Sequence, residues 1–243
     1  MSIVFKILKR ALIAIVSLFC ISVIVFLLWR INSGNTPSSI KTLTPNASLS
    51  EAYERDGKDL YMFFQPRQLE YTANEGASGY FFVSETAIIP AANQMQTVVR
   101  YNNSTLKGIT EKYSLPAIPD RESEVFEYSL VVAIDLTPED QSDNLSEDED
   151  KVRLVRCSGK VTDTYTKNMY NFRRVVFEFD ESEVDLEALV NDGTLIAIYM
   201  EYFYSGAEDR DVALANMCIY DYLNDNERVK LTRKDKKAIE AFE

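Results

Sequence analysis

The chain has 243 residues, of which 38 are acidic and 26 are basic, and it contains no histidine. A net charge of −12 disfavours contact with the phosphate backbone of nucleic acids, so we expect no nucleic-acid partner. The absence of histidine excludes Ser-His-Asp and Cys-His catalysis and every histidine-containing zinc site.

The first strong feature along the chain is a run of nineteen uncharged, almost wholly apolar residues at 11–29. As a helix this run measures about 28 Å, close to the hydrocarbon thickness of a bilayer. Its Leu, Ile, Val and Phe side chains favour insertion by about 4–8 kcal/mol. The run is longer than the apolar part of a signal peptide and has no small-residue cleavage site after it. It therefore predicts a retained transmembrane helix that contacts the lipid bilayer.

Basic residues flank this run unevenly: Lys6, Lys9 and Arg10 precede it, and Arg30 and Lys41 follow it. Positive charge is retained on the cytoplasmic side of a membrane. We therefore expect residues 1–10 to form a short cytoplasmic tail and the remainder to lie outside the cell. This predicts a single-pass signal-anchor protein of the plasma membrane.

Residues 30–50 are rich in Asn, Ser, Thr and Pro and show no apolar period, which predicts a flexible polar linker. All 38 acidic residues follow this segment, together with 21 of the 26 basic ones, so residues 51–243 carry a net charge of −17. We expect these residues to form one acidic extracytoplasmic domain.

Alternation of apolar and polar residues dominates this domain, and such a period of two is typical of half-buried strands. The clearest runs are Phe126–Leu136, Val175–Phe179 and Ile196–Tyr204, and shorter β-rich runs lie at 60–65, 80–84, 96–101, 152–157 and 215–222. Eight runs separated by turn-rich segments favour an antiparallel β-sandwich-like domain.

Helical patterns are few in this domain. Residues 182–191 are compatible with a short helix or with a crossover between strands. Thr232, with Asp235 three residues later, resembles a capping box that opens a short C-terminal helix.

The chain has three cysteines, of which Cys20 lies in the apolar run. Outside a cell, Cys157 and Cys218 could form a disulfide if their Cα atoms lie within about 7 Å. Two buried free thiols are the other interpretation, and the sequence leaves both open.

Two segments resemble functional motifs, but neither carries the features that its chemistry requires. The acidic run at 139–150 is dense in potential Ca²⁺ ligands, yet it lacks the spacing and the glycine of a calcium-binding loop. Ser104 and Lys107 match S-x-x-K without the companion motifs of serine β-lactamases. We interpret the first as a solvated loop and the second as a chance match. No catalytic residue, metal site or cofactor is therefore expected.

The best candidate for a binding surface is formed by Tyr199, Glu201 and Phe203, which share one face of a predicted strand. Tyrosine and phenylalanine on a sheet face are suited to contacts with a protein or with a sugar ring. We expect a non-enzymatic envelope protein that binds a protein partner as an accessory subunit of a membrane assembly. The alternative is a membrane-tethered carbohydrate-binding or carbohydrate-active domain that uses carboxylates and exposed aromatic residues.

Overall fold

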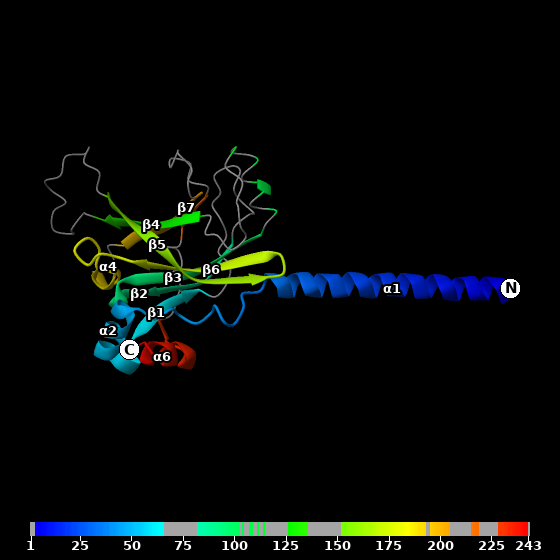
Figure 1. Ribbon diagram of the computed structural model, residues 1–243, viewed down its shortest axis with the longest axis horizontal. Coiled ribbons are helices and arrows are strands. Elements are labelled where there is room, and N and C mark those ends of the chain that lie inside the picture. Colours follow the sequence, from blue (N-terminus) through cyan, green and yellow to red (C-terminus); the bar gives the residue numbers. More distant parts are fainter. Residues whose placement is uncertain are drawn as a thin grey trace.

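The computed structural model describes residues 3–65, 82–102, 104, 107–108, 111, 114, 126–135, 152–192, 195–204, 215–218 and 228–242. Positions 3, 4, 65, 135, 196, 197, 199–204 and 215–218 are described by their backbone. One long helix, α1, projects from a β-rich domain that carries short helices on one side (Figure 1). This confirms the predicted order of an N-terminal apolar helix, an antiparallel β domain and a short C-terminal helix.

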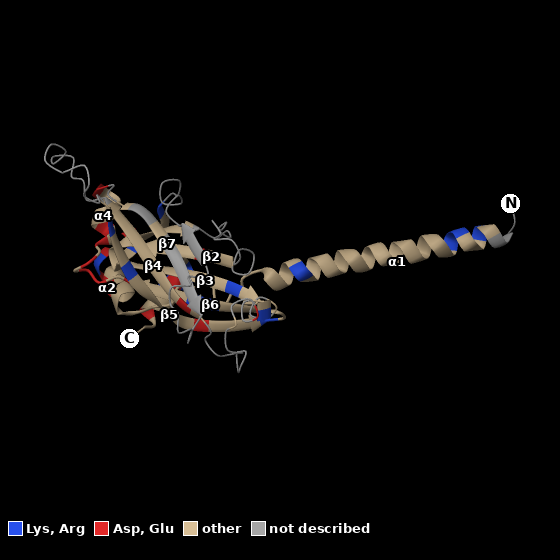
Figure 2. Ribbon diagram, turned by 90° about the horizontal axis from the view of Figure 1, so that it is seen from above, with Lys and Arg blue, Asp and Glu red and all other residues tan. Residues whose placement is uncertain are grey.

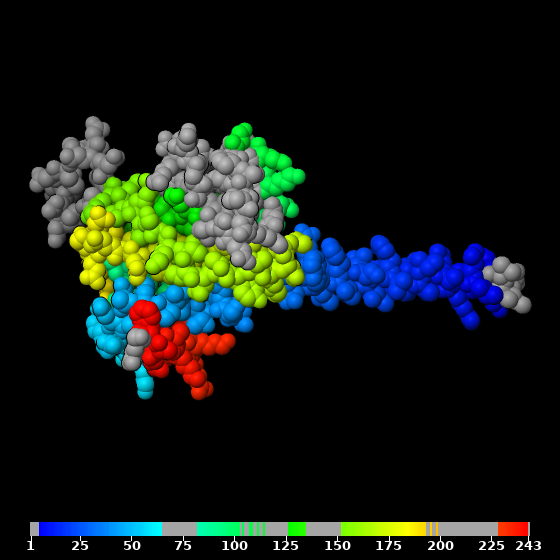
Figure 3. Space-filling model, in the orientation of Figure 1, coloured from blue at the N-terminus to red at the C-terminus, as the bar shows by residue number. Residues whose placement is uncertain are grey.

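Helix α1 (Ile3–Gly34) is longer than the predicted span at both ends, because residues 3–10 of the expected tail and residues 30–34 are also helical. Within the described part of the chain it is the one helix long and apolar enough to cross a membrane. Its apolar side chains are exposed, as Leu18 shows at 67%. Lys and Arg lie near both of its ends and no acidic residue lies on it (Figure 2). In the space-filling view α1 stands clear of the domain (Figure 3).

The described strands form one antiparallel sheet in the order β8-β7-β4-β5-β6-β3-β2-β1-β9. Their bounds, in chain order from β1, are Tyr61–Gln65, Phe82–Ile89, Gln94–Asn102, Phe126–Asp135, Val152–Lys167, Tyr170–Glu178, Leu195–Tyr204, Ala215–Cys218 and Arg228–Lys230. Local alternation identified most of them, since a strand with one buried face has a period of two in its own residues.

The long strand β5 bends the sheet back over itself. Its residues 152–158 pair with β4 and its residues 159–167 pair with β6. Gly159 lies at the change of partner, where an added Cβ would be 2.5 Å from a ring carbon of Phe177. A glycine is needed there because the two strands approach closely. We call β8, β7, β4 and the start of β5 the β4 half, and the remaining strands the β3 half.

The main core lies between these two halves, as in a sandwich (Figure 1). Tyr101 of β3 meets Phe126 of β4 edge to face, with ring centroids 5.3 Å apart. The members with no more than 1% exposure are Met95, Val99, Tyr101, Leu130, Val132, Val175, Phe177, Leu186 and Ile198. Leu186 belongs to α4 (Leu186–Asp192), so the short helix is the correct one of the two interpretations of residues 182–191.

A second core lies on the opposite face of the β3 half, under α2 (Ala47–Asp56) and α6 (Arg233–Glu240). Two single-turn helices, η1 (Gly57–Asp59) and η2 (Pro90–Ala92), lie beside it. Thr232 and Asp235 form the predicted capping box at the start of α6. The buried apolar residues here are Leu43, Leu49, Ala52, Leu60, Met62, Ala87, Ile89, Ala92, Leu231 and Ile239.

The polar segment after α1 does not form the flexible linker that its composition predicts. Residues 30–34 complete α1, and residues 35–46, here called the strap, lie against the outer face of the β3 half. Ile40 and Leu43 of the strap are only 3% and 4% exposed. The β domain therefore begins near residue 35 rather than at 51. The polar composition suggests a solvated linker. In the structure, buried side chains of the sheet, rather than water, form hydrogen bonds with the backbone groups of the strap.

Candidate functional site at the junction of helix and sheet

The tip of the β5–β6 hairpin holds the last turn of α1. Lys167 Nζ donates to the carbonyl oxygen of Asn32 at 2.7 Å, and Asn168 Nδ2 donates to Ser33 Oγ at 2.6 Å. The last carbonyl groups of a helix have no partner within the helix and carry partial negative charge. A lysine at this end therefore satisfies a hydrogen bond and also interacts favourably with the helix dipole.

Arg100 of β3 makes the second contact with the end of α1. Its guanidinium donates to the carbonyl oxygen of Gly34. It also lies over two rings, with Cζ 4.2 Å from the ring centroid of Phe82 and 4.9 Å from that of Tyr170. Stacking between rings orients the guanidinium plane. Together with the hairpin, Arg100 joins α1 to the sheet directly.

Side chains of the β3 half then bind the strap along its length. Gln96 and the backbone of Thr44 exchange two hydrogen bonds, of 2.9 Å and 2.8 Å. Arg174 Nη2 donates to the carbonyl oxygens of Ile40 and, at 3.2 Å, of Thr42. All of these hydrogen bonds are made with backbone atoms of the strap. They therefore do not depend on which side chains the strap carries.

Arg174 is fully buried beneath the strap. Burial lowers the pKa of its guanidinium from the ordinary value to about 10, while the nearby charges of Glu85, Asp163 and Asp235 act in the opposite direction. Arg174 therefore remains charged at neutral pH. Its Nε and Nη1 atoms have no hydrogen-bond partner among the residues that the structure describes. Nearby carboxylates and the carbonyl groups of the strap stabilise the positive charge of Arg174.

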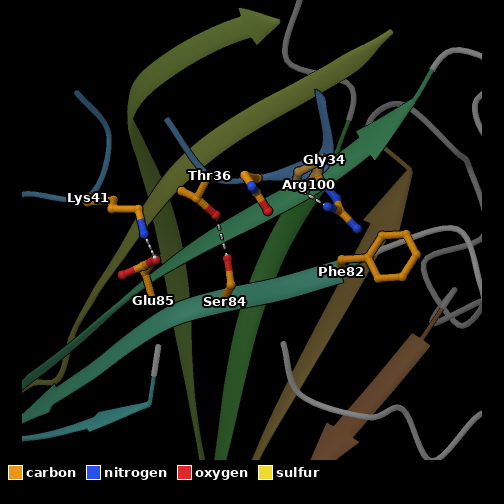
Figure 4. A pocket seen from close by; sticks show the side chains of 8 residues that line it. Gly34, Thr36, Lys41, Phe82, Ser84, Glu85 and Arg100 are labelled. Atoms are coloured by element: carbon orange, nitrogen blue, oxygen red, sulfur yellow. Dashed lines mark hydrogen bonds and ion pairs between the residues drawn. The ribbon is translucent and has the colours of Figure 1, made fainter. Parts of the chain in front are cut away.

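A pocket of about 430 Å³ opens between the strap and the sheet, beside the end of α1 (Figure 4). Four of its residues come from the end of α1 and the strap, three come from β2 and one comes from β3. They are Gly34, Asn35, Thr36, Lys41, Phe82, Ser84, Glu85 and Arg100.

The lining of this junction pocket is mainly polar. Lys41 Nζ lies 2.6 Å from Glu85 Oε1, and Thr36 Oγ1 lies 3.1 Å from Ser84 Oγ. In Figure 4, Lys41 and Arg100 lie toward opposite ends of the pocket, with the two hydroxyl groups between them. Two cations and one carboxylate thus line a pocket in an acidic protein. Lys41 and Glu85 neutralise each other, so the arrangement suits a polar ligand that can form several hydrogen bonds.

Glu85 reaches the pocket through an irregularity in β2. The pairing of β2 with β3 shifts between Ser84 and Ala87, and Glu85 has a backbone φ of +50°. A left-handed conformation costs of order 1–3 kcal/mol in a residue other than glycine and is frequent at functional sites. The carboxylate is 7% exposed, beneath the more exposed Lys41.

The structure does not bring the three predicted surface residues to this pocket. Tyr199, Glu201 and Phe203 lie on β7, in the β4 half, and their backbone positions pair with Val131, Ser129 and Glu127. Their side chains lie outside the described part of the structure, and their binding role stays a prediction.

The Cys157–Cys218 bridge that the sequence allows is not formed. Cys157 is a free, buried thiol whose Sγ donates to the carbonyl oxygen of Glu178 at 2.9 Å. Cys218 lies on β8, and the strands β4 and β7 separate it from β5. Three strand spacings amount to about 14 Å, twice what a disulfide spans. Burial raises the pKa of the Cys157 thiol to about 11, so the unreactive protonated form predominates at neutral pH.

Two further motifs remain from the sequence, the acidic run and the S-x-x-K match. The acidic run at 139–150 lies outside the described residues. Lys107 is exposed and lies 3.7 Å from Glu111, in an ordinary surface ion pair. Among the described residues no three His, Cys, Asp or Glu side chains gather as a metal site would require.

Sequence reasoning missed the residues that build the junction. Arg100 and Arg174 lie in strands that are otherwise rich in valine and phenylalanine. These charged residues were the signal in the sequence that could have pointed to the junction. A charged residue within such a strand indicates a buried polar partner or a solvent-facing position. The partners here are backbone groups of a distant segment, which no local pattern specifies.

Comparison of the chain with protein-family models, with curated proteins and with solved structures found no match.

Proposed function

We propose that the chain is a single-pass plasma-membrane protein whose acidic β domain lies outside the cell and binds a protein partner. In this role it is a non-enzymatic accessory subunit of an envelope assembly. Helix α1 is the anchor, with its N-terminal end toward the cytoplasm. The observation that carries the proposal is the direct joint between α1 and the sheet.

The joint leaves little free chain between the membrane and the domain. Asn32 follows Trp29 by three positions, or about 4.5 Å of helix, and already accepts a hydrogen bond from Lys167. The strap continues this attachment up to Asn46, whose side chain donates to Gln94 at 2.9 Å. A domain held in this way presents the same face to its surroundings at all times.

A fixed orientation favours a partner held in, or close to, the same membrane. Two components held in one plane meet repeatedly in the same relative orientation, which raises the effective concentration of one for the other. An enzyme that acts on freely diffusing substrates gains little from this restriction. The net negative charge of the domain favours a partner with a complementary basic surface.

Photo-crosslinking in intact cells tests this role. A photoreactive amino acid would replace Leu154 of β5, Val229 of β9 or Phe242 after α6, which are 66%, 37% and 46% exposed. We expect at least one position to yield a discrete adduct with another membrane-associated protein. The yield of that adduct should fall when ten Gly and Ser residues are inserted after Gly34, because the insertion uncouples the domain from α1. Monomer alone at all three positions, or an adduct unaffected by the insertion, would contradict the proposal.

A further inference from the structure

We propose that the tip of the β5–β6 hairpin is a second membrane contact of this protein, with Met169 inserted among the lipid headgroups beside α1. The partner of this surface is the headgroup layer around the C-terminal end of α1. The inference rests on the proposed function in one respect, namely that α1 spans a bilayer.

The hairpin follows the strap back toward the end of α1. Thr162 Oγ1 lies 2.9 Å from Thr44 Oγ1, near the far end of the strap. Five positions later on the same strand, Lys167 donates to the carbonyl oxygen of Asn32. In Figure 1 the turn that follows Lys167 lies beside the domain end of α1. When α1 spans a bilayer, this turn is therefore the end of the hairpin nearest the membrane.

The turn consists of Asn168 and Met169, and both neighbours of Met169 lie against the last turn of α1. Asn168 Nδ2 donates to Ser33 Oγ at 2.6 Å. On the other side, a Cβ added to Gly34 would be 4.0 Å from the Cε2 ring carbon of Tyr170. Met169 lies between these two contacts and is 40% exposed. Tight turns usually carry Gly, Asn, Asp or Ser, so an exposed methionine is uncommon at this position.

This attachment sets the depth of the turn in the membrane. Trp29 ends the apolar run, and tryptophan is enriched at the boundary between hydrocarbon and headgroups. Asn32 and Ser33 follow it by three and four positions, or about 4.5 and 6 Å of helix. The headgroup layer adds about 5–8 Å to each side of the hydrocarbon core. When residues 11–29 fill that core, the turn that contacts Asn32 and Ser33 lies within the headgroup layer.

The composition of the hairpin suits this layer. Met169 has a flexible apolar side chain, and its insertion removes exposed apolar surface from water. Tyr165 is 41% exposed on the same hairpin, and its apolar ring with a polar hydroxyl is typical of residues at membrane interfaces. Residues 164–177 contain no Asp or Glu, although residues 51–243 as a whole carry a net charge of −17. The hairpin tip therefore approaches lipid phosphates without the repulsion that an acidic surface would meet.

Tryptophan fluorescence of the full chain in nanodiscs tests this contact, because Trp29 is the single tryptophan of the sequence. In a Trp29→Phe background, Met169→Trp places the reporter at the tip. The matched control is Leu154→Trp, at a position 66% exposed on the same strand, thirteen residues before Lys167. The nanodiscs contain phosphatidylcholine with or without a nitroxide on its headgroup, which quenches tryptophans at headgroup depth. Circular dichroism establishes that the variants remain folded.

We expect the nitroxide lipid to quench wild-type Trp29 and the reporter at position 169, and to leave the reporter at position 154 unquenched. A further reporter, Tyr165→Trp, exchanges one exposed aromatic residue for another and should show intermediate quenching. A reporter at position 169 that is quenched no more than the one at position 154 would overturn the proposal. If Met169→Trp does not fold, the comparison of position 165 with position 154 decides in the same way.

The failure of this inference and that of the proposed function are distinguishable. Quenching in nanodiscs requires no protein partner, whereas the crosslinked adduct in cells requires no contact between the hairpin and lipid. Quenching of Trp29 without quenching at the hairpin would overturn this inference alone. Absence of quenching at Trp29 would remove the premise that α1 spans a bilayer and overturn both.

Discussion

The carboxylate of Asp235 accepts a hydrogen bond from the backbone N–H of Leu43 at 2.8 Å. The same side chain accepts a hydrogen bond from the backbone N–H of Thr232 at 3.1 Å, within the capping box of α6. Asp235 is 4% exposed, so water does not replace these bonds when the carboxylate is lost. One residue thus stabilises the start of the last helix and also fastens the strap.

This double role predicts that Asp235→Ala destabilises the protein by about 2–4 kcal/mol. Loss of the capping-box hydrogen bond to the N–H of Thr232 costs about 1 kcal/mol, and the buried N–H of Leu43, left without a partner, costs about 1–3 kcal/mol more. Urea unfolding, followed by circular dichroism, measures the change in the free energy of unfolding. Lys234→Ala, at the exposed neighbouring position, serves as the control and should change it by less than about 0.5 kcal/mol. Similar losses for both variants would contradict the assigned role.

Removal of Arg174 should release the strap. In Arg174→Ala the carbonyl oxygens of Ile40 and Thr42 lose their donor, and each buried acceptor left without a partner costs about 1–3 kcal/mol. Loss of the buried charge offsets part of this cost. Hydrogen exchange is the more specific measurement, and we expect faster exchange at residues 40–44 than in the core strands. The control is Arg153→Ala, at an exposed position of β5. Unchanged protection of the strap would refute this role of Arg174.

Because the Cys157 thiol is buried, we expect the protein to lose stability at alkaline pH. Its pKa in the folded protein is raised from 9.0 to about 11, so the thiol keeps its proton longer in the folded state than in the unfolded state. The corresponding stabilisation is fully present below pH 9 and is lost as the pH rises toward 11. It amounts to about 2–3 kcal/mol at most.

Comparison of the wild type with Cys157→Ser between pH 7 and 11 isolates this contribution. Both proteins lose stability through their other groups, but the wild type should lose more between pH 9 and 11. Parallel curves over that interval would show that ionisation of Cys157 is not coupled to folding.

Because hydrogen bonds join the end of α1 to the sheet, we expect a narrow distribution of distances between the helix and the sheet. Spin labels at Lys9 and Leu154, in a cysteine-free background reconstituted in nanodiscs, measure this distribution by pulsed electron resonance. The double variant Lys167→Ala/Asn168→Ala removes the hairpin contacts with Asn32 and Ser33 and should broaden it. A broad distribution in the background protein would indicate a free tether. Substitution of the exposed Thr164 by Ala is the matched control on the same hairpin.

The elements that sequence analysis predicted correctly depend on local patterns. The apolar run at 11–29 and the alternation in Phe126–Leu136 are visible because helices and strands have fixed periods in their own residues. The capping box of Thr232 and Asp235 also joins residues only three positions apart. The sequence left open whether Cys157 pairs with Cys218, because strand order rather than spacing along the chain determines their separation.

The sequence by itself determined that this protein has an apolar helix long enough to cross a membrane, followed by an acidic antiparallel β domain. Only the tertiary structure decided that the two are joined without a free linker. The strap has no apolar period because its partners are buried side chains of the sheet and α6. In the most distant of these contacts, Leu43 bonds to a carboxylate 192 positions away. The junction pocket exists for the same reason, since it forms only where the strap crosses β2 and β3.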